Sequence, residues 1–141
     1  MSKDKRVFHF PKTFVALAIV WFFGSGLSFI LIGLLLVNGY GFVQSDGISM
    51  EPTFSDKCFH LAKNIDWSNG GRLEIGDVSV RERIGVDWLH RIVGKCESGY
   101  IHRGDANSYD DGCFPFSHYT HKIIFSLCLD SDNGISVRVE K

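Results

Sequence analysis

The sequence predicts a mainly β domain that follows a long apolar segment near the amino terminus. After residue 57, short runs with the composition of β-strands are separated by turn residues, among them Asn69-Gly70-Gly71 and Asp132-Asn133-Gly134. Outside the apolar segment the sequence has no long amphipathic helical pattern, repeat or low-complexity stretch. Its 141 residues are enough for one modest domain and a membrane anchor.

Residues 14–37 form an apolar run without Asp, Glu, Lys, Arg or His. At about 1.5 Å per residue, a helix over this run is about 36 Å long and crosses a bilayer. A cleavable signal peptide has an apolar core of only about 7 to 15 residues before a small-x-small site, so we favour a transmembrane helix. The basic leader at residues 1–13 is expected to be poorly ordered and to stay in the cytoplasm.

Residues 38–141 then form a mainly β domain on the exported side of the membrane. Residues 38–44 are interpreted as a link at the membrane surface. We predict strands over residues 58–63, 77–82, 88–93, 100–103, 123–129 and 135–139. The net charge of −1 and the lack of a basic stripe argue against a nucleic-acid partner.

All four cysteines, Cys58, Cys96, Cys113 and Cys128, lie in the predicted exported domain, where disulfides persist. Two disulfides, one disulfide and buried free thiols are all compatible with the sequence. The cysteines contain no Cys-x-x-Cys, and a zinc site needs closer ligands than Cys96, His102 and Cys113. We therefore expect no metal and no cofactor.

The segment Gly47-Ile48-Ser49-Met50-Glu51-Pro52-Thr53-Phe54 places a serine in a turn shortly after the apolar run. Even a fully extended chain keeps Ser49 within about 40 Å of the end of that run, and hence near the bilayer. Taken alone, Ser49 is typical of a structural serine in a turn before Pro52. A role as nucleophile requires a base elsewhere in the chain and hydrogen-bond donors for the oxyanion.

Motifs downstream supply these groups in an ordered series. Gly76-Asp77-Val78 is followed by His90-Arg91-Ile92-Val93-Gly94, and then by Gly104-Asp105-Ala106-Asn107, which leads on to Asp110-Asp111. With Ser49 to Thr53, these motifs resemble those of the type I signal peptidases, the membrane-bound serine proteases that remove signal peptides from secretory precursors. The resemblance covers roughly Val37 to Leu129.

The resemblance implies a catalytic role for four residues. Ser49 is the nucleophile, His90 the general base, and Asp111 the carboxylate that orients His90, with Asp105 in a supporting role. Asp110 is the less favoured partner of His90. The implied fold is a signal-peptidase-like β catalytic domain behind one transmembrane helix.

The resemblance also implies how a substrate is bound. Met50 packs beneath the nucleophile, and the turn at Pro52 fixes its presentation. Gly47 stands where some relatives have a serine that donates to the oxyanion, so here the oxyanion depends mainly on backbone N–H groups, including that of Ser49. Residues 42–48 and 87–89 flank the site as walls of a groove for an extended substrate with small residues before the cut.

His90 indicates which type of family member the chain resembles. Many bacterial members have lysine here, whereas the endoplasmic-reticulum and archaeal types and a minority of bacterial ones have histidine. A lysine must be desolvated to lower its pKa from about 10.4, whereas a histidine, with a pKa of about 6.5, is already largely neutral at pH 7. A histidine needs a carboxylate to orient its ring instead.

The other residues near these motifs are interpreted as structural. Arg91 is expected in an ion pair, and Gly76-Asp77 in a turn that leads into a strand. The histidines that match no motif are expected at the surface or as satisfied core residues: His60, His102, His118 and His121.

The sequence thus predicts a single-pass serine endopeptidase that removes signal peptides from exported precursors, in a plasma or endoplasmic-reticulum-like membrane. Its expected partners are those precursors and the lipid bilayer; a partner subunit in the membrane is a further option. Two alternatives stay open. One is a processing peptidase dedicated to a pilin-like or coat-like partner, and the other is a non-catalytic β adaptor held at the membrane.

Overall fold

The computed structural model describes residues 8–10, 21, 27–83, 86–130 and 134–139. Within these ranges the chain is mainly β, which confirms the coarse fold class. Its helix and strands are α2 (Leu27–Val37), β1 (Phe8–Phe10), β2 (Tyr40–Gln44), β3 (Phe59–Asn64), β4 (Val78–Arg83), β5 (Val86–Cys96), β6 (Gly99–Arg103), β7 (Gly112–Pro115), β8 (Tyr119–Asp130) and β9 (Gly134–Val139). Short 3₁₀ turns lie at Trp67–Asn69 and Phe116–His118.

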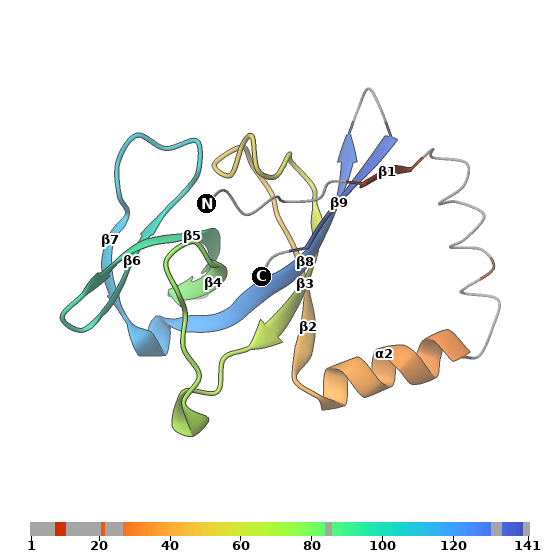
Figure 1. Cartoon of the computed structure of the whole chain (residues 1–141), viewed down its shortest axis with the longest axis horizontal. Coiled ribbons are helices and arrows are strands. Elements are labelled where there is room, and N and C mark those ends of the chain that lie inside the picture. Colours follow the sequence, from red (N-terminus) through yellow and green to blue (C-terminus); the bar gives the residue numbers. More distant parts are fainter. Residues whose placement is uncertain (1–7, 11–20, 22–26, 84–85, 131–133, 140–141) are drawn as a thin grey trace.

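The described strands form one antiparallel sheet (Figure 1). Its main path runs β1-β9-β8-β4-β5-β6-β7, and β3 pairs with both β2 and β8. In Figure 1 the long strand β8 crosses the middle of the domain, with α2 and β2 to one side and β6 and β7 to the other. Because β8 pairs with β3 and β4, it links the strand that follows the serine turn to the hairpin that carries His90.

Every predicted strand is present, with ends that differ from the predictions by a few residues. The short strands β2 and β7 were not predicted. β2 occupies the expected link, and its residue Phe42 lies opposite Leu61 of β3. Glycine is depleted in strands, so Gly41, together with Gly39 just before the strand, made β2 difficult to predict from sequence. A Cβ added at Gly41 would meet only His121 Nε2 and Cδ2 within 4 Å, at 3.5 and 3.7 Å, which are ordinary packing distances.

Strand β1 corrects the expectation of a poorly ordered leader. Phe8 and Phe10 pair antiparallel with Val137 and Ile135 of β9, so part of the leader extends the sheet. Alternation of apolar residues in Phe8-His9-Phe10 is the local pattern of a strand, but three residues are too few to identify one from sequence.

Of the predicted transmembrane helix at residues 14–37, residues 14–20 and 22–26 lie outside the described residues, and its carboxyl-terminal part is α2. Among the helices that the structure describes, none is both long and apolar enough to cross a membrane. Apolar side chains of α2 are exposed, including Phe29, Leu34 and Val37. The helix ends at Val37, and the backbone and side-chain N–H groups of the next residue, Asn38, both donate to the Leu34 carbonyl, at 3.1 and 2.7 Å.

An apolar core lies beneath the turn that carries Ser49. Met50 and Phe54 are buried, and the Phe54 N–H donates to the Met50 carbonyl at 2.9 Å. Burial of such side chains stabilises a fold by about 1.5 to 3 kcal/mol each. The core consists of buried apolar residues from this turn and from three strands of the sheet: Met50, Phe54, Cys58, Ala62, Val78, Val80, Ile123 and Cys128. Burial of Met50 and Phe54 in this core thus fixes the turn that carries Ser49.

The cysteines form two disulfides, Cys58–Cys128 and Cys96–Cys113, which settles the alternatives left by the sequence. Cys58–Cys128 lies inside the core. Ser45 and Cys58 are also hydrogen-bonded to each other, among others from the Ser45 N–H to the Cys58 carbonyl at 3.0 Å and from the Cys58 N–H to Ser45 Oγ at 3.2 Å. This disulfide therefore also fixes the chain just ahead of Ser49.

We expect loss of Cys58–Cys128 to destabilise the protein more than loss of Cys96–Cys113. The two disulfides span sequence separations of 70 and 17. Loop closure in the unfolded chain then predicts losses of about 4 and about 3 kcal/mol in the free energy of unfolding. Urea unfolding of the two double alanine variants measures both values, and the reverse order would contradict the expectation.

His60 is a buried histidine on β3. Its Nδ1 lies 2.8 Å from Ser126 Oγ, and its ring stands edge-on to Phe54 with centroids 4.8 Å apart. Burial lowers the pKa of His60 from 6.5 to about 4. The unfolded chain therefore binds a proton at this residue below about pH 6.5, whereas the folded chain does so only near pH 4.

We expect the free energy of unfolding to fall as the pH drops from about 6.5 towards 4, because protons favour the unfolded chain in that range. In His60→Leu this contribution is absent. Near pH 5 the free energy of unfolding of the variant should then change less steeply with pH than that of wild type, by about 1.4 kcal/mol per pH unit. Urea unfolding at several pH values measures both slopes. Equal slopes in wild type and variant would show that His60 does not titrate in this way.

Candidate active site

Ser49 lies in the turn between β2 and β3, and hydrogen bonds hold this turn both before and after the serine. Gly47 has φ +103°, a left-handed value that favours glycine. Its N–H donates to Asp56 Oδ1 at 2.9 Å, and this hydrogen bond is the main cause that lowers the pKa of the Asp56 carboxyl. Beyond the serine, the Pro52 carbonyl accepts a hydrogen bond from Arg138 Nη2 at 3.3 Å.

His90 connects Ser49 to Asp111. It lies buried on β5, opposite Ser79 of β4. Its Nε2 is 2.9 Å from Ser49 Oγ, and its Nδ1 is 2.5 Å from Asp111 Oδ2. A turn, a strand and a loop thus contribute one side chain each to a continuous chain of hydrogen bonds. This is the arrangement of a nucleophile, a general base and an orienting carboxylate.

Asp105 occupies a different position from the one expected of a residue that helps to orient His90. It forms a two-pronged ion pair with Arg91, with Nε–Oδ1 at 2.7 Å and Nη2–Oδ2 at 2.6 Å. Arg91 Nη1 also donates to the Gly76 carbonyl at 2.8 Å. The predicted ion pair of Arg91 is therefore confirmed. Through the neighbouring Arg91, Asp105 ties the acidic loop (residues 104–111) to β5.

The turn at Gly76-Asp77 is structural, as predicted. Asp77 Oδ2 accepts a hydrogen bond from the Glu74 N–H at 2.8 Å, and Asp77 Oδ1 lies 2.9 Å from Lys122 Nζ. The turn leads directly into β4. It holds the start of β4 against β8, away from the serine itself.

The acidic loop packs directly against the serine turn. The Ala106 N–H donates to the Ser49 carbonyl at 2.9 Å. A Cβ added to Gly104 would lie 2.6 Å from the Ser49 carbonyl oxygen, 2.9 Å from Asn107 Nδ2 and 3.0 Å from His90 Nε2. Only glycine fits here. Because the added Cβ would lie so close to both nitrogens, Asn107 Nδ2 itself lies within about 6 Å of His90 Nε2.

The two neighbouring aspartates of the acidic loop differ in their surroundings. Asp110 is exposed and lies 3.3 Å from Arg103 Nη1. Asp111 points inward to His90, and its N–H donates to the His102 carbonyl on β6 at 2.8 Å. The structure thus distinguishes Asp111 as the partner of His90.

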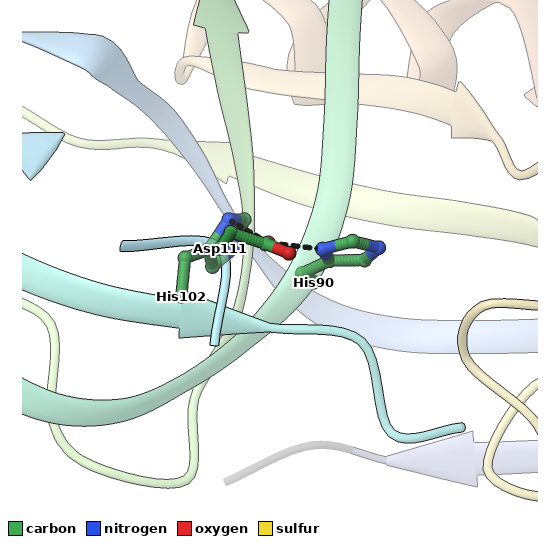
Figure 2. A group of neighbouring side chains, drawn as sticks. All are labelled: His90, His102 and Asp111. Atoms are coloured by element: carbon green, nitrogen blue, oxygen red, sulfur yellow. Dashed lines mark hydrogen bonds and ion pairs between the residues drawn. The ribbon is translucent and has the colours of Figure 1, made fainter. Parts of the chain in front are cut away.

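His102 contradicts the expectation of a surface or satisfied core residue. It is fully buried, and its Nδ1 has no hydrogen-bond partner among the described residues. Figure 2 shows Asp111 between the rings of His90 and His102, with His102 Nδ1 at 3.8 Å from Asp111 Oδ2. Burial, followed by the nearby His90, lowers the pKa of His102 from 6.5 to about 4. A neutral imidazole therefore lies on the far side of the orienting carboxylate.

A pocket of about 640 Å³ opens beside Ser49 and His90. Its walls include residues of both segments that were expected to flank a substrate groove, 42–48 and 87–89. Val43, Trp88 and Leu89 line it with apolar side chains, and Arg81 and Asn107 line it with polar groups. The pocket can hold an extended peptide against the serine hydroxyl.

His102 and Asn107 are site residues to which the sequence analysis assigned no role. The register of the β5–β6 hairpin is the signal that places His102 near His90. Ile92 of β5 lies opposite His102 of β6, and His90 is two residues before Ile92 on the same face. Asn107 lies within the acidic motif, but its spacing alone does not indicate where its amide points.

Chemically, the site can transfer a proton from a serine hydroxyl to an imidazole and can hold a peptide carbonyl nearby. Comparisons with protein-family models, curated proteins and solved structures find no match to the chain. A function for this site therefore follows from its geometry and from the order of its sequence motifs.

Proposed function

We propose that the protein is a membrane-anchored serine endopeptidase of the signal peptidase type, which removes signal peptides from exported precursors. The observation that carries this proposal is the chain of hydrogen bonds from Ser49 through His90 to Asp111 at the wall of a pocket. The order of the surrounding motifs in the sequence supports the same function.

In this proposal Ser49 Oγ attacks the scissile carbonyl carbon while His90 Nε2 takes the hydroxyl proton. His90 then gives that proton to the leaving amine, the C–N bond breaks, and an acyl ester on Ser49 remains. Water, activated by the same nitrogen, hydrolyses the ester and restores the serine. Asp111 accepts a hydrogen bond from His90 Nδ1, which keeps Nε2 free as the base and stabilises the imidazolium.

The backbone N–H of Ser49 and the side-chain amide of Asn107 are the proposed donors to the oxyanion. Both lie at the pocket, and the acidic loop that carries Asn107 is bonded to the Ser49 carbonyl. An amide side chain serves well here, because a fixed donor stabilises charge that develops only in the transition state. Asn107 would replace the hydroxyl donor that Gly47 lacks.

We expect Asn107→Ala to lower kcat by about 10²- to 10³-fold with little change in KM, since the lost hydrogen bond forms mainly in the transition state. Steady-state kinetics on a precursor peptide measures both constants. Asn69→Ala is the matched control, because Asn69 lies in the 3₁₀ turn at Trp67–Asn69 and does not line the pocket. A change in KM alone would reassign Asn107 to ground-state binding.

The anchor is proposed at residues 14–37, with the β domain on the exported side. Two observations support this placement. Exposed apolar side chains on α2 are stable against lipid, and the disulfides persist in oxidising compartments. Because α2 leads directly into β2, the serine would lie near the bilayer, where a signal peptide is presented.

In the structure β1 pairs with β9, whereas an anchor that crosses the bilayer between them would place these strands on opposite sides of the membrane. In sealed vesicles with the β domain outside, an amino-terminal epitope is then protected from added protease while the β domain is digested. Digestion of the epitope together with the β domain would instead show that β1 stays on β9 and that residues 14–37 do not cross the bilayer.

Labelling with a serine-reactive phosphonate tests the enzymatic proposal without knowledge of the substrate. We expect the probe to attach to Ser49 in wild type and to fail with His90→Ala, because the hydroxyl is reactive only beside its base. A non-catalytic adaptor predicts no labelling of folded wild type. Cleavage trials on several precursors then distinguish a general peptidase, which cuts many, from one dedicated to a single pilin-like or coat-like partner.

A further inference from the structure

Two imidazole rings face one carboxylate beside the proposed nucleophile. One ligand atom from each of His90, His102 and Asp111 lies within 4.8 Å of the others. Asp111 Oδ2 is 2.5 Å from His90 Nδ1 and 3.8 Å from His102 Nδ1 (Figure 2). Two histidine nitrogens and one carboxylate oxygen are a donor set that suits Zn²⁺ and similar divalent ions.

His102 Nδ1 lacks a hydrogen-bond partner in the described part of the chain, although the residue is fully buried. A buried polar atom left unpaired destabilises the folded state. This ring nitrogen faces the Asp111 carboxylate, with Nδ1 at 3.8 Å from Oδ2 (Figure 2). Coordination of an ion would give this nitrogen a partner.

The backbone holds the three residues in fixed relative positions. β5 and β6 are paired next to the site, with Ile92 opposite His102, and the Asp111 N–H donates to the His102 carbonyl at 2.8 Å. Zn–N and Zn–O distances of about 2.0 to 2.2 Å separate tetrahedral ligand atoms by about 3.3 Å. The distances from Asp111 Oδ2 to the two histidine nitrogens lie on either side of this value and differ from it by less than about 1 Å. All three ligand atoms lie within 4.8 Å of one another, so small side-chain movements would bring them to an ion.

We propose that His90, His102 and Asp111 bind a zinc-like divalent transition-metal ion, and that the bound ion switches off the peptidase. Binding depends only on the three side chains, whereas the inhibition rests on the proposed function. The pocket gives access, because His90 and Asp111 line it, and pocket water would take the fourth coordination position.

The chemistry of inhibition follows from the histidine tautomer. In the proposed resting enzyme the His90 proton is on Nδ1, where Asp111 accepts it, and Nε2 is free to take the proton of Ser49. A neutral imidazole that ligates a metal through Nδ1 carries its proton on Nε2. The proton moves from one ring nitrogen to the other, none is lost, and the base is no longer available.

Isothermal calorimetry with Zn²⁺ tests the site on the Ser49→Ala protein, purified without a histidine tag, so that binding is measured independently of activity. We expect one saturable site, and a tetrahedral absorption spectrum with Co²⁺. His102→Phe removes one ligand, and its affinity should fall by more than the roughly 10- to 100-fold typical of losing an outer hydrogen-bond partner. His121→Gln, a half-buried histidine elsewhere on β8, is the control and should bind normally.

Equal zinc affinity in His102→Phe and its parent, or no saturable binding at all, would overturn the site. If His102→Phe does not fold, NMR of the imidazole ¹⁵N nuclei decides instead. With one equivalent of Zn²⁺ the His90 and His102 signals should shift, and shifts confined to other histidines would refute the proposal. Zinc binding without peptidase activity in wild type would refute the proposed function alone. Peptidase activity that zinc leaves unchanged would refute the inhibition.

Discussion

Ser49→Ala is expected to lower the rate of precursor cleavage by about 10⁶-fold. The hydroxyl is the atom that bonds to the substrate carbonyl in the proposed mechanism, and Ser49 Oγ is already 2.9 Å from His90 Nε2. Without it, the site retains only its pocket and its oxyanion donors. Single-turnover cleavage with enzyme in excess measures the chemical step directly.

The control for Ser49→Ala is Ser108→Ala, which removes an exposed serine of the acidic loop that does not line the pocket. This variant should cleave at the wild-type rate. Ser49 is held in its turn mainly by backbone contacts and by the burial of Met50, so the alanine variant should unfold at the same urea concentration as wild type. A Ser49→Ala protein that keeps more than about a thousandth of the activity would exclude Ser49 as the nucleophile.

Asp111→Asn has the second-largest expected effect, a fall of about 10⁴-fold in kcat. The carboxylate accepts a hydrogen bond from His90 Nδ1 and thereby holds Nε2 ready as the base. An amide can donate to Nδ1 instead, which favours the tautomer with its proton on Nε2, and it does not stabilise the imidazolium. The measurement is kcat across the pH range, so that a shift of the pH optimum is not mistaken for a loss of activity.

The adjacent Asp110 provides a matched control for this substitution. Asp110→Asn makes the same chemical change one residue away, but its carboxylate is exposed and pairs with Arg103. We expect kcat to stay within about twofold of wild type, because exposed ion pairs contribute little. Equal losses in Asp110→Asn and Asp111→Asn would mean that the acidic loop acts only through its fold, and that Asp111 does not orient His90.

Part of the fold could be predicted from sequence because apolar and polar residues alternate along its strands. Ile135, Val137 and Val139 show this in β9, and turn residues separate the strands. Strands β2 and β7 were missed because each is short and contains a glycine, a residue that is depleted in strands. The pairing of β1 with β9 joins opposite ends of the chain, which local patterns do not indicate.

The candidate site was predictable from the order of its motifs, but its geometry was not. Spacing alone does not decide which acidic residue reaches His90. The fold decides, because the Asp111 N–H is bonded to the His102 carbonyl and turns the carboxylate inward, while Arg91 engages Asp105. The disulfide pairing likewise needed the sheet order, which brings β3 beside β8.

Cleavage of a full-length exported precursor by the detergent-solubilised protein tests the central claim most directly. The precursor should carry a signal peptide that ends in a small-x-small site, and the product is identified by amino-terminal sequencing. We predict one cut, directly after that site, by wild type and none by Ser49→Ala. If folded wild type is as inert as Ser49→Ala on several such precursors, the protein is not a signal peptidase.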